Sequence, residues 1–180
     1  MSGITAVIAA AVAAVGFSGC FEAAAKLPYI STVQTGSVDK MEKTDFKRIT
    51  IRESGMMAQV TEYELLKTED GITVSQYFGR WSLYDGAGRE ECLYKKVEGD
   101  KAMYEKFAKL AANCNVKGWD GFDGVDMEVL DGQSIMVEAE LADGKTIYAH
   151  GSNSYPAGYF EFVDEVYNVL KDAEVLNELY

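Results

Sequence analysis

The chain of 180 residues has few histidines and cysteines. It contains one histidine and three cysteines, and these form no Cys-x-x-Cys pair or cysteine–histidine cluster, so we predict neither a zinc site nor any other cofactor. Basic residues are also scarce: 17 Lys and Arg stand against 29 Asp and Glu, which gives a net charge of −12. This charge opposes binding to nucleic acid, and we predict no nucleic-acid partner.

The first 19 residues contain no charged residue. The apolar run within them, residues 4–15, has the length of a signal-peptide core and is shorter than the roughly 20 residues of a membrane span. After it, Phe17-Ser18-Gly19-Cys20 resembles the lipobox of bacterial lipoproteins, in which small residues precede a cysteine that becomes lipidated, and that is the N-terminal residue after cleavage. The resemblance implies that Cys20 carries a lipid anchor, and that the protein is extracytoplasmic and attached to a bacterial membrane.

Two features depart from the lipobox pattern. Phe17 stands where the pattern prefers Leu, and no Lys or Arg precedes the apolar run. An uncleaved Ala-rich anchor and an ordinary helix at the start of a cytoplasmic protein are therefore the alternatives. The leading interpretation divides the chain into a signal peptide at 1–19, a lipid-attachment cysteine with a tether at 20–44, and one domain at 45–180.

Alternating apolar and polar residues predict several β-strands in that domain. Two pairs of these segments are joined by Asp-Gly turns, at Asp70-Gly71 and Asp143-Gly144, which is typical of β-hairpins. The predicted strands lie around 49–51 and at 59–66, 72–78, 91–97, 135–141 and 146–150.

Two further segments have apolar residues at helical spacing. Asp100 is the predicted N-cap of the first. The two apolar stripes are Met103, Phe107, Leu110, Ala111 and Cys114, and Tyr159, Phe162, Val163, Val166 and Leu170. Hairpin-rich sections that are each followed by a helix predict an α+β fold, with an antiparallel, hairpin-rich sheet and two amphipathic helices packed on one face.

The segment HGSNSYP, residues 150–156, holds the only histidine of the chain. It contains no G-x-S-x-G nucleophile motif, and every residue type in it suits a turn that leads into a helix. We therefore predict no catalytic residue and interpret the segment as a connector. The alternative is a cell-envelope hydrolase that uses His150, and such a site needs an acid behind the imidazole and a hydroxyl beside it.

The C-terminal third of the chain contains KGWDGFDG, then LDGQS, then LADGKTIYAHGSNSYPAGYFEFVDEVYNVL. This arrangement is similar to the C-terminal half of a group of uncharacterised bacterial lipoprotein-like domains. The resemblance implies a secreted fold and supplies no catalytic residues. The matching positions are Trp119, Gly121, Phe122, Asp131, Gly132, Asp143, Gly144, Gly151, Ser152, Asn153, Tyr155 and Pro156.

Aromatic residues are abundant, with eleven Tyr, eight Phe and two Trp. Aromatic side chains offer contact area to ligands, but they also fit the half-buried surface of any sheet. We predict that the protein is a binding or accessory domain whose ligand is a peptide, a glycan or a protein. The candidate groove residues are Trp81, Tyr84, Trp119, Tyr148 and Tyr155.

Acidic residues and cysteines leave two smaller questions open. Asp120, Asp123 and Asp126 lie in a Gly-rich loop and could bind calcium, although their spacing of three differs from the EF-hand pattern and solvated turn residues are the alternative. A calcium-binding envelope protein is thus a further alternative function. Cys92 and Cys114 could form a disulfide in an oxidising compartment or remain as free thiols.

Overall fold

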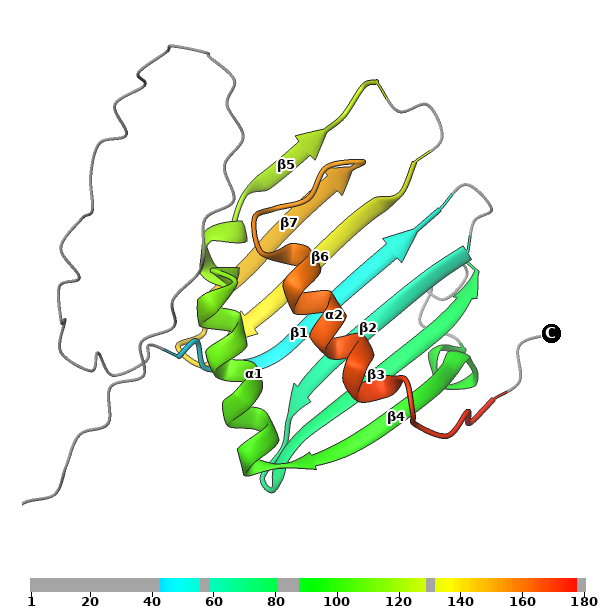
Figure 1. Ribbon diagram of the computed structural model, residues 1–180, viewed down its shortest axis with the longest axis vertical. Helices are drawn as coiled ribbons and strands as arrows, with labels where there is room; N and C mark the ends of the chain where they lie inside the picture. Colours follow the sequence, from blue (N-terminus) through cyan, green and yellow to red (C-terminus); the bar gives the residue numbers. More distant parts are fainter. Residues whose placement is uncertain (1–42, 56–58, 81–87, 129–131, 178–180) are drawn as a thin grey trace, which may run out of the picture. The chain divides into compact units, whose positions relative to one another are not determined.

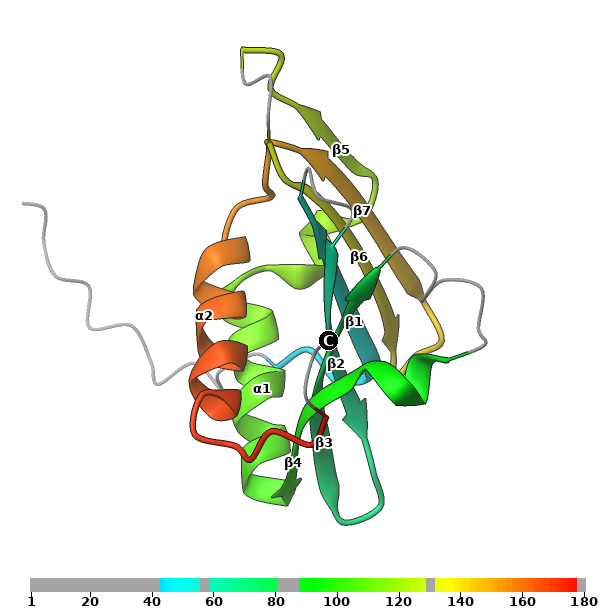
Figure 2. The same cartoon turned by 90° about the vertical axis from the view of Figure 1, so that its right-hand side faces the viewer.

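The computed structural model describes residues 43–55, 59–80, 88–128 and 132–177. These residues form a seven-stranded sheet with two α-helices on one of its faces (Figures 1 and 2), which confirms the predicted α+β fold. The elements are β1 (Phe46–Ser54), β2 (Gln59–Lys67), β3 (Gly71–Arg80), the 3₁₀ helix η2 (Arg89–Cys92), β4 (Leu93–Asp100), α1 (Lys101–Asn113), the 3₁₀ helix η3 (Val116–Trp119), β5 (Phe122–Val125), β6 (Ser134–Leu141), β7 (Thr146–Ser152) and α2 (Tyr159–Leu170).

The strand order in the sheet is β4-β3-β2-β1-β6-β7-β5. Neighbouring strands are antiparallel except for β5, which runs parallel to β7. The two predicted hairpins are β2–β3 and β6–β7, and β1 lies between them as the central strand. Gly144 in the second hairpin turn has a φ of 89°, a left-handed conformation that glycine adopts without a steric penalty.

Alternation along β1 decides which side chains face the helices. Ile49 and Ile51 are buried on the helix side, where Ile51 stands opposite Tyr63 of β2 and Val137 of β6. Side chains that face each other across a register pair share one face of the sheet. The next residue of this parity, Glu53, therefore points to the helix side as well.

The helices cover this face with apolar stripes. The Asp100 side chain accepts a hydrogen bond of 2.9 Å from the Met103 amide, which confirms the predicted N-cap of α1. The buried residues of α1 are Tyr104, Phe107, Ala108 and Ala111, whereas Met103 and Leu110 of the predicted stripe are only half-buried. In α2 the buried residues are Tyr159, Phe162, Val166 and Leu170, as predicted, while Val163 is half-buried.

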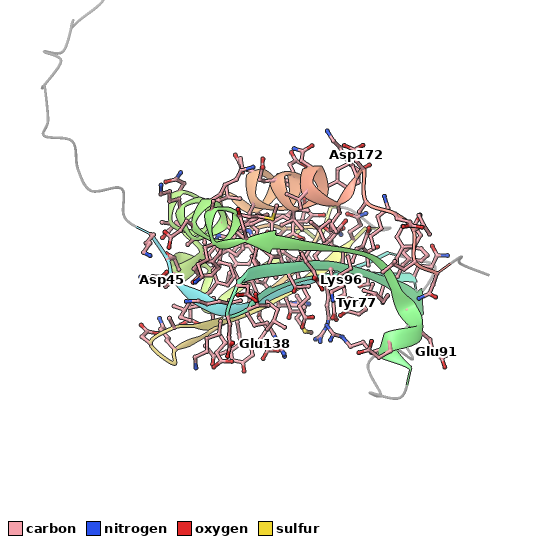
Figure 3. The ribbon with its side chains drawn as sticks, turned by 90° about the horizontal axis from the view of Figure 1, so that it is seen from below. Asp45, Tyr77, Glu91, Lys96, Glu138 and Asp172 are labelled. Carbon is pink, nitrogen blue, oxygen red and sulfur yellow. The ribbon has the colours of Figure 1, made fainter. Side chains whose placement is uncertain are left out.

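The opposite side of the sheet, which we call the open face, carries no α-helix in the described part of the chain. Figure 3 shows Tyr77 and Glu138 pointing away from the helices on this face, and Figure 2 shows η2 on the same side. Within the described residues, neither helix is long and apolar enough to cross a membrane.

Strand β5 is a feature that the sequence did not predict. The sequence predicts a Gly- and Asp-rich loop at 122–125, but these residues pair with β7 from Phe122 opposite Ala149 to Val125 opposite Ser152. The predicted signal peptide, Cys20 and most of the predicted tether lie outside the described residues, as do Trp81, Tyr84 and Asp131.

Candidate functional site

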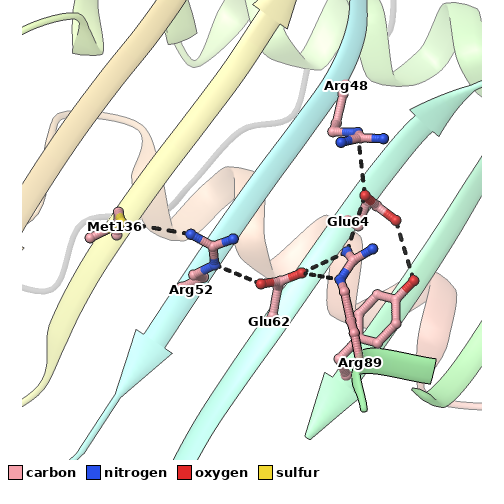
Figure 4. A network of polar contacts seen from close by, with 7 residues as sticks. Arg48, Arg52, Glu62, Glu64, Arg89 and Met136 are labelled. Carbon is pink, nitrogen blue, oxygen red and sulfur yellow. Dashed lines mark hydrogen bonds and ion pairs between the residues drawn. The ribbon is translucent and has the colours of Figure 1, made fainter. Parts of the chain in front are cut away.

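The open face is tied together by a network of ion pairs that we call the arginine–glutamate network (Figure 4). Its two carboxylates, Glu62 and Glu64 of β2, are only 7% and 6% exposed. Each carboxylate has two arginine partners. The pairs are Glu62 with Arg52 (2.6 Å) and Arg89 (2.6 Å), and Glu64 with Arg48 (3.3 Å) and Arg89 (3.1 Å).

Arg89 links this network to η2. Its guanidinium lies 4.1 Å from the centre of the Tyr77 ring, and the Tyr77 hydroxyl donates a hydrogen bond of 3.3 Å to Glu64. Shielded carboxylates are costly unless they are paired and hydrogen-bonded, and here both requirements are met. The network therefore holds η2 against the sheet, and its carboxylates are already neutralised by arginines.

A pocket of about 310 Å³ opens at the end of the sheet where β1 finishes and β2 begins. We call it the Glu53 pocket. The residues that line it are Glu53, Ser54, Gly55, Gln59, Thr61, Phe78 and Gln133. Glu53, Thr61 and Phe78 are register partners across β1, β2 and β3, so their side chains point to the helix side of the sheet.

Glu53 lies between this pocket and the first turn of α2. The Tyr159 hydroxyl donates a hydrogen bond of 2.8 Å to Glu53 Oε1. Burial raises the pKa of the Glu53 carboxyl above its ordinary value, and the hydrogen bond from Tyr159 counteracts this only in part. Among the described side chains, none forms an ion pair with Glu53, which distinguishes it from Glu62 and Glu64.

Tyrosines surround Glu53 and remain protonated at neutral pH. Burial, followed by the Glu53 charge, raises the pKa of Tyr63 to about 12 and also raises the pKa values of Tyr155 and Tyr159. Neutral phenols are hydrogen-bond donors to a carboxylate but cannot neutralise its charge. The surroundings of Glu53 are therefore polar and lack a compensating cation among the described residues.

An aromatic cluster borders the pocket on the α2 side. The Tyr155 ring packs against Tyr159 and Phe160, with ring centroids 5.2 Å and 4.6 Å apart. The Tyr155 hydroxyl also donates a long hydrogen bond of 3.4 Å to Gln133 Oε1, at the wall of the pocket. Because Phe160 is 56% exposed, this cluster adds apolar surface next to a polar pocket.

His150 lies on the open face, as its parity in β7 predicts. Its Nδ1 atom is 3.0 Å from Asp123 Oδ1 of β5, and the two side chains are 50% and 78% exposed. Strand pairing brings them together, since Asp123 and His150 are register partners. Among the described residues, no serine or cysteine is hydrogen-bonded to His150, so the geometry does not assemble a nucleophile–base pair there.

The structure separates the predicted groove residues. Trp119 is 1% exposed in the core, where its Nε1 atom donates a hydrogen bond of 2.8 Å to the Ala157 carbonyl. Tyr148 is 58% exposed on the open face, whereas Tyr155 borders the Glu53 pocket. These three do not line one groove.

The predicted calcium ligands have separate partners. Asp120 accepts from the Tyr148 amide and pairs with Lys145, Asp123 contacts His150, and Asp126 accepts from the Glu128 amide. No three His, Cys, Asp or Glu side chains of the described residues converge as metal ligands.

Cys92 and Cys114 are free thiols in the structure, so it contains no disulfide between them. Cys92 ends η2 on the open-face side, while Cys114 caps α1. Burial raises the pKa of both thiols above the ordinary value, which disfavours the reactive thiolate.

Glu53 is not among the predicted site residues, although the alternation of β1 indicates that its carboxylate faces the core side. Glu53 follows Ile49 and Ile51 at the same parity, so the alternation places a carboxylate in line with two core residues. A charged residue at a predicted core position is unusual and indicates a special environment.

Comparisons with known proteins add no identification: no family model, no curated protein and no solved structure matches this chain.

Proposed function

We propose that this protein is a lipid-anchored extracytoplasmic binding domain whose ligand site is the Glu53 pocket. The observation that carries the binding role is a half-buried carboxylate that faces a 310 Å³ pocket and has a tyrosine hydroxyl, rather than a cation, as its partner. Maintaining such a group costs stability, and costs of this kind concentrate at functional sites. The lipobox-like context of Cys20 supports the anchor.

The anchor is tested by metabolic labelling of the full chain in a bacterial host with a fatty-acid probe. We expect the wild type to incorporate the probe and to fractionate with the membrane, because lipidation of Cys20 adds acyl chains. Cys20→Ser should lose the label.

Cys92→Ser is the matched control, since it also removes one thiol but lies far from the lipobox in the sequence, and it should label like the wild type. Equal labelling of Cys20→Ser and the wild type would refute the anchor.

A further inference from the structure

We propose that the Glu53 pocket binds its ligand through a primary ammonium group, supplied either by a lysine side chain or by a free amine. This inference rests on the proposed binding function and names the ligand class for the same site. It follows from the contrast between the carboxylates of the two sheet faces, from the polar groups of the pocket wall, and from the way in which Tyr159 occupies one carboxylate oxygen.

The contrast concerns how the buried carboxylates of Glu62 and Glu64 and the half-buried carboxylate of Glu53 are compensated. On the open face, Glu62 and Glu64 each have two arginine partners. On the helix side, Glu53 has the Tyr159 hydroxyl and no ion-pair partner among the described side chains. A carboxylate that is partly removed from water is stabilised most by an opposite charge, so a cationic ligand would supply what the described protein groups do not.

The pocket wall suits the hydrogen-bonding needs of an ammonium group. An ammonium has three N–H donors and no acceptor, so it needs several oxygen acceptors around it. The lining residues with oxygen acceptors on the helix-side parity are Glu53, Gln59 and Thr61, and Gln133 adds an amide oxygen that also accepts from Tyr155. The aromatic ring of Phe78, also in the wall, is compatible with a cation and with the methylene groups that carry it.

Tyr159 favours an ammonium over a guanidinium. A guanidinium binds a carboxylate best as a fork that uses both oxygens. Because Oε1 of Glu53 already accepts the 2.8 Å hydrogen bond from Tyr159, a fork would compete with that bond. A compact ammonium needs only one carboxylate oxygen. The net charge of −12 also favours cationic over anionic ligands at long range.

The test maps amine binding on the full-length chain that carries Cys20→Ser, so that it does not depend on lipidation. Putrescine represents a free amine, and the blocked peptide acetyl-Gly-Lys-Gly-amide represents a lysine side chain. We expect at least one of them to shift the backbone amide resonances of Gln59, Thr61 and Gln133 in a saturable manner. A shift with putrescine alone indicates a free amine as the ligand, and a stronger effect of the peptide indicates a lysine side chain.

Variants of the pocket wall decide whether Glu53 is responsible. Glu53→Gln should weaken amine binding about tenfold or more, since it removes the charge and keeps an oxygen acceptor for Tyr159. Glu138→Gln removes an exposed charge from the open face and should leave binding unchanged. Gln133→Lys, at an exposed position, should abolish binding by placing a cation in the pocket, and it keeps the test valid if Glu53→Gln folds poorly.

Neutral and guanidinium probes show which part of the proposal fails: binding of an amine, or preference for an ammonium over a guanidinium. If 1,4-butanediol or glucose shifts the pocket amides and the amines do not, the ammonium proposal is overturned and the binding pocket stands. Equal binding of acetyl-Gly-Arg-Gly-amide would overturn the preference for an ammonium. The ammonium proposal also fails if no probe shifts these amides, or if Glu53→Gln and Gln133→Lys bind amines like the wild type. These outcomes do not bear on the lipid anchor, which the Cys20 labelling tests separately.

Discussion

Glu53, Glu62 and Glu64 are carboxylates of two adjacent strands that differ in the face to which they point. Parity directs Glu62 and Glu64 to the open face, where Arg52, Arg89 and Arg48 compensate their charges. The same alternation directs Glu53 toward α2 and a tyrosine. One residue of shift along a strand therefore decides whether a carboxylate is part of a structural network or is left for another role.

The unpaired state of Glu53 should be visible in the pH dependence of stability. Burial raises the pKa of Glu53 in the folded protein, so between the unfolded and the folded pKa values the folded state binds more protons. Stability therefore falls as the pH rises through that window, so the Glu53 carboxyl favours the folded state less at neutral pH than at acidic pH. We expect Glu53→Gln to have a higher thermal unfolding midpoint than the wild type at neutral pH.

This difference should shrink as the pH falls below 4.5, the ordinary value for glutamate, because Glu53 is then protonated in both states. Glu138→Gln is the control, since Glu138 is exposed and should change the midpoint little at either pH. A Glu53→Gln protein that is less stable than the wild type at neutral pH would show that the charge of Glu53 is compensated.

At the scale of elements, the connector from β7 to α2 is a turn that leads into a helix, as predicted for HGSNSYP. Asn153 adopts the left-handed conformation in it, with a φ of 53°. Gly151 is needed for close packing, because a Cβ atom there would collide with the Ser154 carbonyl oxygen and approach Ile135 Cγ1 to 3.0 Å. The chain thus turns back on itself directly beside β6.

Replacement of Gly151 should therefore destabilise the protein more than replacement of its neighbour. We expect Gly151→Ala to cost about 1–3 kcal/mol, the usual range when a well-packed site is overfilled. Ser152→Ala, at a half-buried position, should cost less than about 1 kcal/mol. Urea denaturation of the two variants measures the difference, and equal midpoints would mean that the connector relaxes around the added methyl group.

The elements that could be predicted from sequence are those with a local signal. The Asp-Gly hairpins, the N-cap at Asp100 and the stripe of α2 depend on neighbouring residues, and all three are confirmed. Strand β5 has four residues, FDGV, and forms only because β7 offers a parallel partner, so no local pattern reveals it. The buried face of α1 is centred on Tyr104, whose hydroxyl bonds the Phe46 backbone, a contact that periodicity alone cannot show.

The candidate site also combines a feature with a local sequence signal and a feature that depends on a distant contact. Parity could have drawn attention to Glu53, because it requires only the alternation of β1. Its partner Tyr159 could not have been found, since the two residues are 106 positions apart and meet only when α2 packs on the sheet. Aromatic content predicts a groove position for Trp119, but it does not reveal which face a side chain takes, and Trp119 is buried in the core.

At the scale of the whole molecule, α2 closes the core over the sheet and also delivers Tyr159 to Glu53. Packing and site assembly therefore depend on the same helix. Phe162 is the centre of this packing: it is fully buried, and its ring lies 5.8 Å from Trp119 and 6.4 Å from Phe107 in edge-on arrangements. The contacts join α2 to α1 and η3, the elements that precede β5.

Removal of the Phe162 ring should therefore destabilise the molecule as a unit. We expect Phe162→Ala to lower the free energy of unfolding by about 3–5 kcal/mol, the range for phenylalanine in packed cores, which is a large part of the about 5–15 kcal/mol of a typical domain. Glu161→Ala, at the exposed neighbouring position, should cost no more than about 1 kcal/mol, from the loss of an acid in the first helical turn.

Thermal and urea unfolding of both variants measure these changes. Amine binding by Phe162→Ala should weaken only under conditions where unfolding begins. If both variants were equally mild, α2 would not be packed on the sheet as described, and the position of Tyr159 beside Glu53 would lose its structural basis.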